Sequence, residues 1–190
     1  MNEISSSDTA FLDGFERVLS DGLLKICDNF GLTAGAFLEC PDVQEKWDAG
    51  YLKDYVADAV LNFNSYPDAA LAWAAFLGMG VAVMWDRDWT AGSAMAYKDY
   101  YGSRGWDDMD EHILHDLMYL NLEKDEAKRI SSVMLSCSQA TQELIRREGI
   151  EPQTSRGFFV LVRCYCVFFK LGATIALRRL GYKKVLMNQN

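Results

Sequence analysis

At 190 residues the chain is long enough for one domain with its own core, and its 50% hydrophobic content argues against general disorder. A net charge of −8 disfavours nucleic acid and anionic membrane surfaces, because phosphate groups are bound by clustered Lys and Arg. It favours a basic protein partner or a metal cation, and it also serves simply to keep a protein soluble.

Cysteine usage and the first residues predict a cytoplasmic location. An odd number of cysteines without CxxC spacing argues against a disulfide framework or a zinc ribbon, and reduced thiols suit a reducing compartment. The opening stretch, "MNEISSSDTAFLDGFERV", has no basic segment followed by an apolar run, so no signal peptide is expected. The five cysteines are Cys27, Cys40, Cys137, Cys164 and Cys166.

The first half of the chain predicts three helices. Apolar residues at intervals of three and four indicate an amphipathic helix over 9–30. A second helix is expected from about Pro41 to Asn64, with Pro41 in its first turn. The inward residues of the first helix are Phe11, Leu12, Phe15, Val18, Leu19, Leu23, Ile26 and Phe30.

The third predicted helix, about 67–86, carries no charge from Ala69 to Trp85. Seventeen residues is the short limit for a membrane span, and this run is rich in small residues. Small side chains let neighbouring helices approach closely, which favours the centre of a bundle over a span. We therefore predict a buried core helix and no membrane partner.

The second half of the chain predicts three more helices after an irregular segment rich in tyrosine and glycine. They cover about 107–121, 124–148 and 154–180, and the last is almost entirely apolar. The fold class expected is therefore an all-α, single-domain bundle of six to seven helices over 1–182, followed by a flexible tail at 183–190.

The 107–121 segment holds the only two histidines, His112 and His115, together with Glu111 and Asp116. On a helical wheel both imidazoles point away from the apolar face. Residues three or four apart on a helix can chelate one cation, so these four residues are candidate ligands for a divalent metal, the one cofactor that the sequence suggests. The alternative interpretation is a solvated helix face with Asp107 as its cap.

Two further groups of residues suggest a small-molecule site. Trp85, Asp86 and Trp89 combine aromatic walls with a carboxylate. Arg163 and Lys170 lie on one stripe of the very apolar last helix, where a buried cation requires a partner. We expect Asp54 or Asp58 of the second helix, or Asp86 or Asp88, to pair with them.

No complete catalytic motif is present, so the sequence leaves open whether the protein is an enzyme. It resembles no family closely enough to name one. The leading hypothesis is a protein-interaction or regulatory module that uses its acidic, histidine-bearing face, and a homodimer is compatible with it. The alternatives are a metal-dependent hydrolase using His112 and His115 with helix carboxylates, and a small-molecule binder around Trp85, Trp89 and the Arg163–Lys170 stripe.

Overall fold

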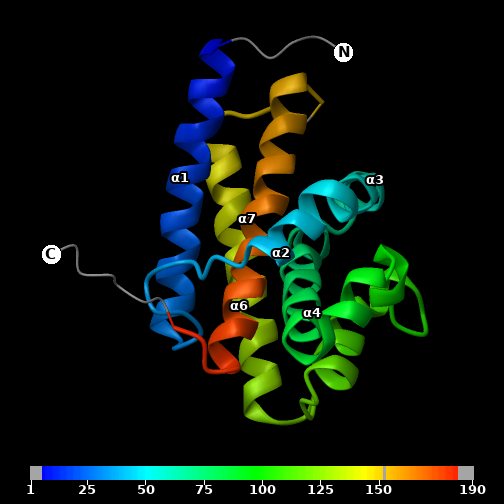
Figure 1. Ribbon diagram of the computed structural model, residues 1–190. Helices are drawn as coiled ribbons and strands as arrows, with labels where there is room; N and C mark the ends of the chain where they lie inside the picture. Colours follow the sequence, from blue (N-terminus) through cyan, green and yellow to red (C-terminus); the bar gives the residue numbers. More distant parts are fainter. Residues whose placement is uncertain (1–5, 152, 184–190) are drawn as a thin grey trace, which may run out of the picture.

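The computed structural model describes residues 6–151 and 153–183, and within these ranges the chain is helical, with no β-strand (Figure 1). The predicted all-α bundle is thus confirmed. The helices are α1 (Ser6–Asn29), α2 (Pro41–Lys46), α3 (Leu52–Phe63), α4 (Pro67–Ala94), α5 (Met109–Glu111), α6 (Asp125–Arg147) and α7 (Ser155–Arg179). Residues 184–190 of the predicted tail lie outside the described residues.

The two most apolar helices, α4 and α7, pack against each other at the centre of the bundle. Their backbones come so close that a Cβ atom at Gly172 would lie 1.7 Å from the carbonyl oxygen of Ala75. A Cβ atom at Gly78 would lie 2.1 Å from the carbonyl oxygen of Phe169. Only glycine fits at these two crossing points, which explains why such small residues occur inside long helices.

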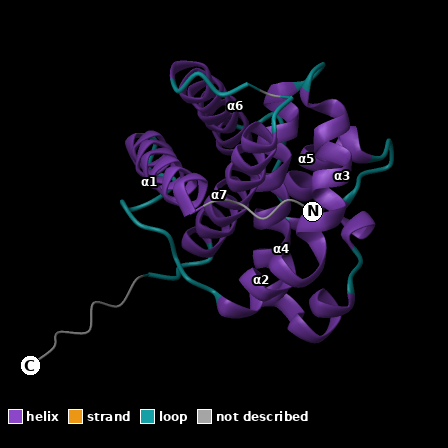
Figure 2. Ribbon diagram, turned by 90° about the horizontal axis from the view of Figure 1, so that it is seen from above, coloured by secondary structure: helices purple, strands orange, loops and turns teal. Residues whose placement is uncertain are grey.

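Seen from above, α1 and α6 lie on one side of α7, and α2 to α5 lie on the other (Figure 2). The apolar face of α1 turns inward as predicted for Leu12, Leu19 and Leu23, whereas Val18 and Phe30 are about half exposed, at 49% and 50%. The sulfur atoms of Cys27 and Cys137 lie 3.8 Å apart in the interior, and neither cysteine is in a disulfide.

The helix predicted over 41–64 is helical throughout but is not one regular α-helix. A π-helical turn, η1 (Trp47–Tyr51), separates α2 from α3. The Trp47 ring stacks on Phe169 of α7 with 4.4 Å between ring centroids, and Tyr51 donates a hydrogen bond of 2.6 Å to the carbonyl oxygen of Met95. These aromatic anchors fix α2 and α3 against the central pair of helices.

Helix α4 is longer than the predicted 67–86 and is broken near its end. The backbone leaves the helical region at Asp88, whose Oδ1 accepts a hydrogen bond of 3.1 Å from the N–H of Ala91 and so caps the last turn. The tyrosine-rich segment that follows contains a 3-10 turn, η2 (Tyr97–Tyr100). Burial raises the pKa of Tyr51 and of Tyr101 to about 12 in each case, so these phenols stay protonated at neutral pH.

Both α4 and α7 are long and apolar enough to cross a membrane. The bundle buries 72% of the apolar window of α4 and 67% of that of α7. Core helices of soluble proteins have the same length and composition, so this property is weak evidence for a span. The cytoplasmic location and the lack of a membrane partner stay predictions.

The α4–α7 contact makes a direct prediction for stability. Gly172→Ala places a methyl group against the Ala75 backbone, and we expect it to lower the free energy of unfolding by about 3 kcal/mol or to prevent folding. Gly22→Ala, in α1 where no heavy atom lies within 4 Å, is the matched control and should raise stability by up to about 1 kcal/mol. Urea unfolding followed by circular dichroism measures both, and equal midpoints for the two variants would contradict the close approach.

Candidate functional site

The histidine-bearing segment is a series of short turns, and the regular helix predicted over 107–121 is wrong in its geometry. A 3-10 turn, η3 (Trp106–Asp108), leads into α5, and the π-helical turn η4 (His112–Leu117) follows. Because the wider π turn rotates side chains by less than 100° per residue, the wheel drawn from an α-helix holds only approximately. The apolar side chains of Met109, Ile113 and Leu114 are nevertheless buried, as the wheel indicated.

Asp108, and not the predicted Asp107, organises the start of this segment. Its carboxylate is 7% exposed and accepts hydrogen bonds from the Ser103 hydroxyl at 3.1 Å and from the backbone N–H of Arg104 at 3.2 Å. The Arg104 guanidinium also binds Asp108 through Nε, at 3.0 Å, and reaches Glu111 at 2.8 Å. This loop requires glycine at position 102, where a Cβ atom would lie 2.4 Å from the Asp108 carboxylate.

The two histidines share one carboxylate. His112 Nδ1 lies 2.8 Å from Asp116 Oδ2, and His115 Nδ1 lies 2.7 Å from Asp116 Oδ1. These hydrogen bonds, from His115 first and then His112, hold the pKa of Asp116 below its usual range, so the carboxylate is ionised at neutral pH. The His115 side chain is 64% exposed and that of His112 is 23% exposed, so neither imidazole is buried among the leucines.

Tyr119 ends this segment in an unusual backbone conformation. Its φ of 56° falls in the left-handed region, which costs a non-glycine residue about 1–2 kcal/mol. The side chain gains little burial in return, since 74% of the residue is exposed. Arg87 of α4 lies over the ring, 4.8 Å from its centroid, and donates a hydrogen bond of 2.6 Å to the carbonyl oxygen of Leu117.

These residues border two adjoining depressions, which we call together the acidic hollow. The larger one, of about 720 Å³, is shallow, and the smaller one measures about 170 Å³. Both are lined by His115, Asp116 and Leu122. The other residues that line them are Tyr119, Leu120, Asn121 and Glu123 in the larger, and Gly102, Ser103, Asp108, Glu111 and His112 in the smaller. The hollow thus combines four carboxylates with an exposed aromatic ring.

The distribution of charge places the acidic hollow in a strongly negative half of the molecule. Residues 39–123, which form α2 to α5 and the turns between them, carry 16 Asp and Glu against 5 Lys and Arg, a net charge of −11. The rest of the chain carries 11 Asp and Glu against 14 Lys and Arg, a net charge of +3. The acidity of the protein therefore belongs to the side of α7 that bears the histidines (Figure 2).

The four predicted metal ligands fall into two separate hydrogen-bonded groups. Glu111 binds Arg104, whereas His112 and His115 both bind Asp116. Among the residues that the structure describes, no group of three His, Cys, Asp or Glu side chains is placed to hold a metal ion. A catalytic zinc needs three protein ligands, so the metal-dependent hydrolase stays a prediction without a third ligand to support it.

Trp85, Asp86 and Trp89, which the sequence predicted to bind a small molecule, lie close in sequence to Asp88, where α4 is broken. Trp85 Nε1 donates a hydrogen bond of 2.9 Å to Asp42, and its ring packs edge-on against Tyr182. The Tyr182 hydroxyl donates a hydrogen bond of 2.8 Å to Asp86, and Trp89 is partly buried. Trp85 and Asp86 thus connect α4 to α2 and to the C-terminal end of α7.

The predicted partners of Arg163 were wrong. Arg163 pairs with Glu16 and, at 3.2 Å, with Asp13, both on α1. Three of the four carboxylates predicted to pair with the α7 cations have other partners: Asp58 binds the Tyr101 hydroxyl, Asp86 binds Tyr182, and Asp88 caps a helical turn. The sequence identified the need for a partner but not the neighbouring helix that supplies it.

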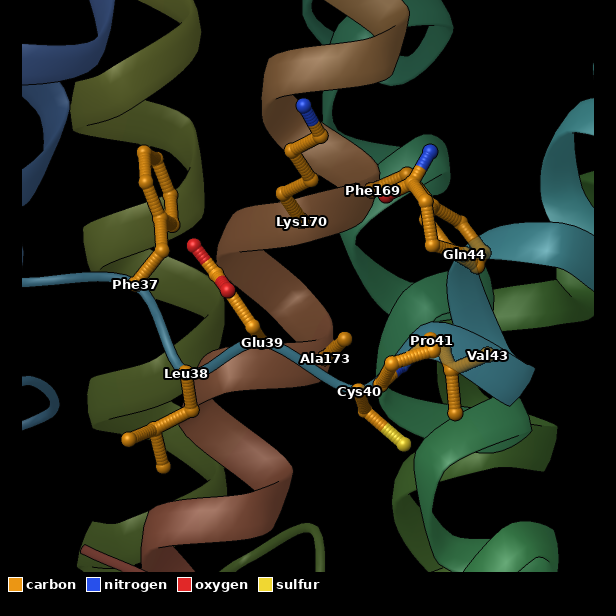
Figure 3. A pocket seen from close by; sticks show the side chains of 10 residues that line it. All are labelled: Phe37, Leu38, Glu39, Cys40, Pro41, Val43, Gln44, Phe169, Lys170 and Ala173. Atoms are coloured by element: carbon orange, nitrogen blue, oxygen red, sulfur yellow. The ribbon is translucent and has the colours of Figure 1, made fainter. Parts of the chain in front are cut away.

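Lys170 lines a pocket of about 350 Å³ (Figure 3). One side of this pocket is α7, and the other is α2 with the connector that precedes it. In this view the side chains of Phe37, Glu39 and Lys170 extend in the same direction, with the Glu39 carboxylate between the other two. Neither Trp85, Asp86, Trp89 nor Arg163 lines this pocket. The residues predicted for small-molecule binding are therefore not brought together at one site.

Comparisons with protein-family models, curated proteins and solved structures gave no match. Any function must therefore be inferred from the residues of this chain. Sequence reasoning missed Tyr119 and Asp108, because a left-handed tyrosine and a buried loop aspartate have no signature in hydrophobic spacing. The glycines at 102 and 105, three residues apart beside an acidic run, were the available signal for that loop.

The Asp108 network predicts acid sensitivity. Hydrogen bonds from the Arg104 side chain and backbone hold the pKa of Asp108 well below its ordinary value of 3.8. A carboxyl group with a depressed folded-state pKa contributes stability above about pH 4, and this contribution is lost as the pH falls through the folded-state pKa. We expect Asp108→Asn to be less stable than the wild type at pH 7 and the difference to shrink between pH 4 and pH 2. Thermal unfolding across this range measures it, with the exposed Asp107→Asn as control; a constant difference would contradict the assignment.

Proposed function

We propose that the protein binds a basic partner protein through the acidic hollow. The observation that supports this most directly is Tyr119, a large aromatic side chain held exposed at the hollow in a strained backbone conformation. Backbone strain persists where the surrounding structure imposes it, and it gathers at binding sites. Tyrosine is also among the residues that contribute most to the binding energy of protein interfaces.

The charge of the hollow defines the chemistry of the partner. Asp116 and Glu123 line the same depression as Tyr119; Asp116 binds the two histidines, and Glu123 forms an exposed ion pair of 3.0 Å with Lys128. An Arg or Lys side chain of the partner would pair with Asp116 and compete with Lys128 for Glu123. It would also pack against the part of the Tyr119 ring that Arg87 leaves exposed. The net charge of −11 on residues 39–123 would speed the approach of a basic surface at low salt.

Tyr119 gives a test that separates binding from stability. Tyr119→Gly relieves the left-handed strain, so the free energy of unfolding should stay the same or rise by up to about 1 kcal/mol. The same change removes the aromatic anchor, and we expect the affinity for the partner to fall at least about tenfold, or about 1.4 kcal/mol. A variant that loses stability and keeps its affinity would show that Tyr119 serves the fold.

The partner is identified by site-specific photocrosslinking. A photoreactive residue at position 123, in the hollow, should capture one basic protein that the same residue at position 143, exposed on α6, does not capture. The purified partner is then measured by surface plasmon resonance against Asp116→Asn/Glu123→Gln. The matched control is Glu143→Gln/Glu148→Gln, which removes the same charge from exposed positions on the far side of α7.

Neutralising the hollow should lower the association rate about tenfold at low salt, with the effect fading as salt rises, and the control should leave the rate unchanged. Identical capture at positions 123 and 143, or equal rates for the two double variants, would overturn the proposal.

A further inference from the structure

A second pocket, of about 370 Å³, lies where the start of α4 meets α5 and α6. We call it the Asp110 pocket. It shares no lining residue with the acidic hollow, and none of its residues was singled out by the sequence. Two features of this pocket determine which ligand it suits: an aromatic wall, and a carboxyl group that has no cation as its partner.

The wall of the Asp110 pocket is aromatic and partly rigid. Trp73 and Phe76, one turn apart on α4, pack edge-on with 5.8 Å between ring centroids. The indole N–H of Trp73 donates a hydrogen bond of 2.7 Å to the carbonyl oxygen of Trp106, which fixes the ring. Tyr66 and Leu135 also line the pocket and are 64% and 45% exposed. The pocket therefore has a fixed inner wall and solvent-exposed apolar side chains at its edge.

Asp110 lines the same pocket and is partly buried. Among the described residues it makes no ion pair with a Lys, Arg or His side chain, whereas Asp108 and Glu111 on either side both pair with Arg104. Its charged form is helped only by backbone N–H groups of its own turn, and burial raises its pKa. A partly desolvated carboxylate next to aromatic rings gains most from a cation that enters from outside.

The other charged groups that line the pocket or act on Asp110 are carboxylates, and the cation closest in sequence, Arg104, is taken up by Asp108 and Glu111. Asp68 of α4 lines the pocket, and Asp108 and Glu111 act on Asp110 through space. Asp68 already accepts a hydrogen bond of 2.6 Å from Gln142 of α6. Ser131, the α6 side chain that lines the pocket beside Leu135, is neutral. Asp68 and Asp110 both line the pocket, and neither forms an ion pair among the described residues, so the pocket favours a cation over an anion.

We propose that the Asp110 pocket binds a small organic cation, an amine or guanidine with an aromatic or apolar body. The cationic head pairs with the Asp110 carboxylate, and the body packs against Trp73 and Phe76. A drug-fragment-sized ligand matches the volume of the pocket. The site is independent of the partner proposed for the acidic hollow, because the two share no side chain.

The test uses three probes of nearly the same shape: 2-phenylethylamine, 2-phenylethanol and phenylacetate. Isothermal titration calorimetry on the full chain at pH 7.5 should show millimolar or tighter binding of the amine, and at least tenfold weaker binding of the alcohol and of the anion. The proposal is overturned if the amine and the alcohol bind equally well. It is also overturned if the amine shows no binding at concentrations up to about 10 mM.

The carboxylate is tested with Asp110→Asn against Asp107→Asn, an exposed control that removes the same charge three residues earlier. Asp110→Asn should weaken amine binding at least tenfold and leave the thermal midpoint equal or higher, because it removes a desolvated charge that has no partner. Asp107→Asn should bind as the wild type does. Unchanged affinity in Asp110→Asn would contradict the assignment.

A second variant keeps the test decisive if Asp110→Asn folds poorly. Leu135→Arg supplies a cation from the exposed edge of α6 and should compete with the amine, while Asp110 itself is untouched. Amine binding that is unaffected by Leu135→Arg would count against the site.

Discussion

The contact between α4 and α7 at Gly78 and Gly172 is the constraint on which the rest of the structure depends. Where a methyl group would overlap a facing carbonyl oxygen, the two backbones are fixed both in register and in distance. The two helices are apolar on nearly every side because each is surrounded by other elements. The remaining helices pack around this pair, with α1 and α6 on one side of α7 and α2, α3 and α5 on the other side, with α4 (Figure 2).

Hydrophobic spacing predicted the elements of this arrangement better than it predicted their contacts. The apolar runs that became α4 and α7, and the amphipathic pattern of α1, are strong periodic signals that tertiary packing reinforces. Spacing contains no information on which helices are neighbours, so Arg163 was assigned partners on the wrong helix. The segment predicted as a helix over 107–121 differs most from the prediction. A buried aspartate, two nearby glycines and a π turn interrupt the periodicity of a regular α-helix there.

The candidate sites share an excess of carboxylates over cations. Most cations of the chain lie in α1, α6 and α7, where Arg156, Arg163 and Arg179 pair across helices. Five Lys and Arg remain for the 16 Asp and Glu of the segment 39–123. Several of its carboxylates are therefore held by hydroxyl groups, histidines or backbone N–H groups, as Asp58, Asp116 and Asp110 are. The segment keeps a net negative charge that attracts an incoming cation.

The unequal division of charge about α7 has one more consequence. The segment 39–123 has a net charge of −11, whereas α1, α6 and α7 together carry 8 Asp and Glu against 11 Lys and Arg, a net charge of +3, so the molecule has a permanent electric dipole moment. Near any strongly charged object, the field exerts a torque on that dipole and rotates the molecule before contact, at separations up to about one Debye length, which grows as the ionic strength falls. The protein would meet a cationic surface with its histidine-bearing side already turned toward it, and it would meet an anionic surface with the helices that include α7 in front.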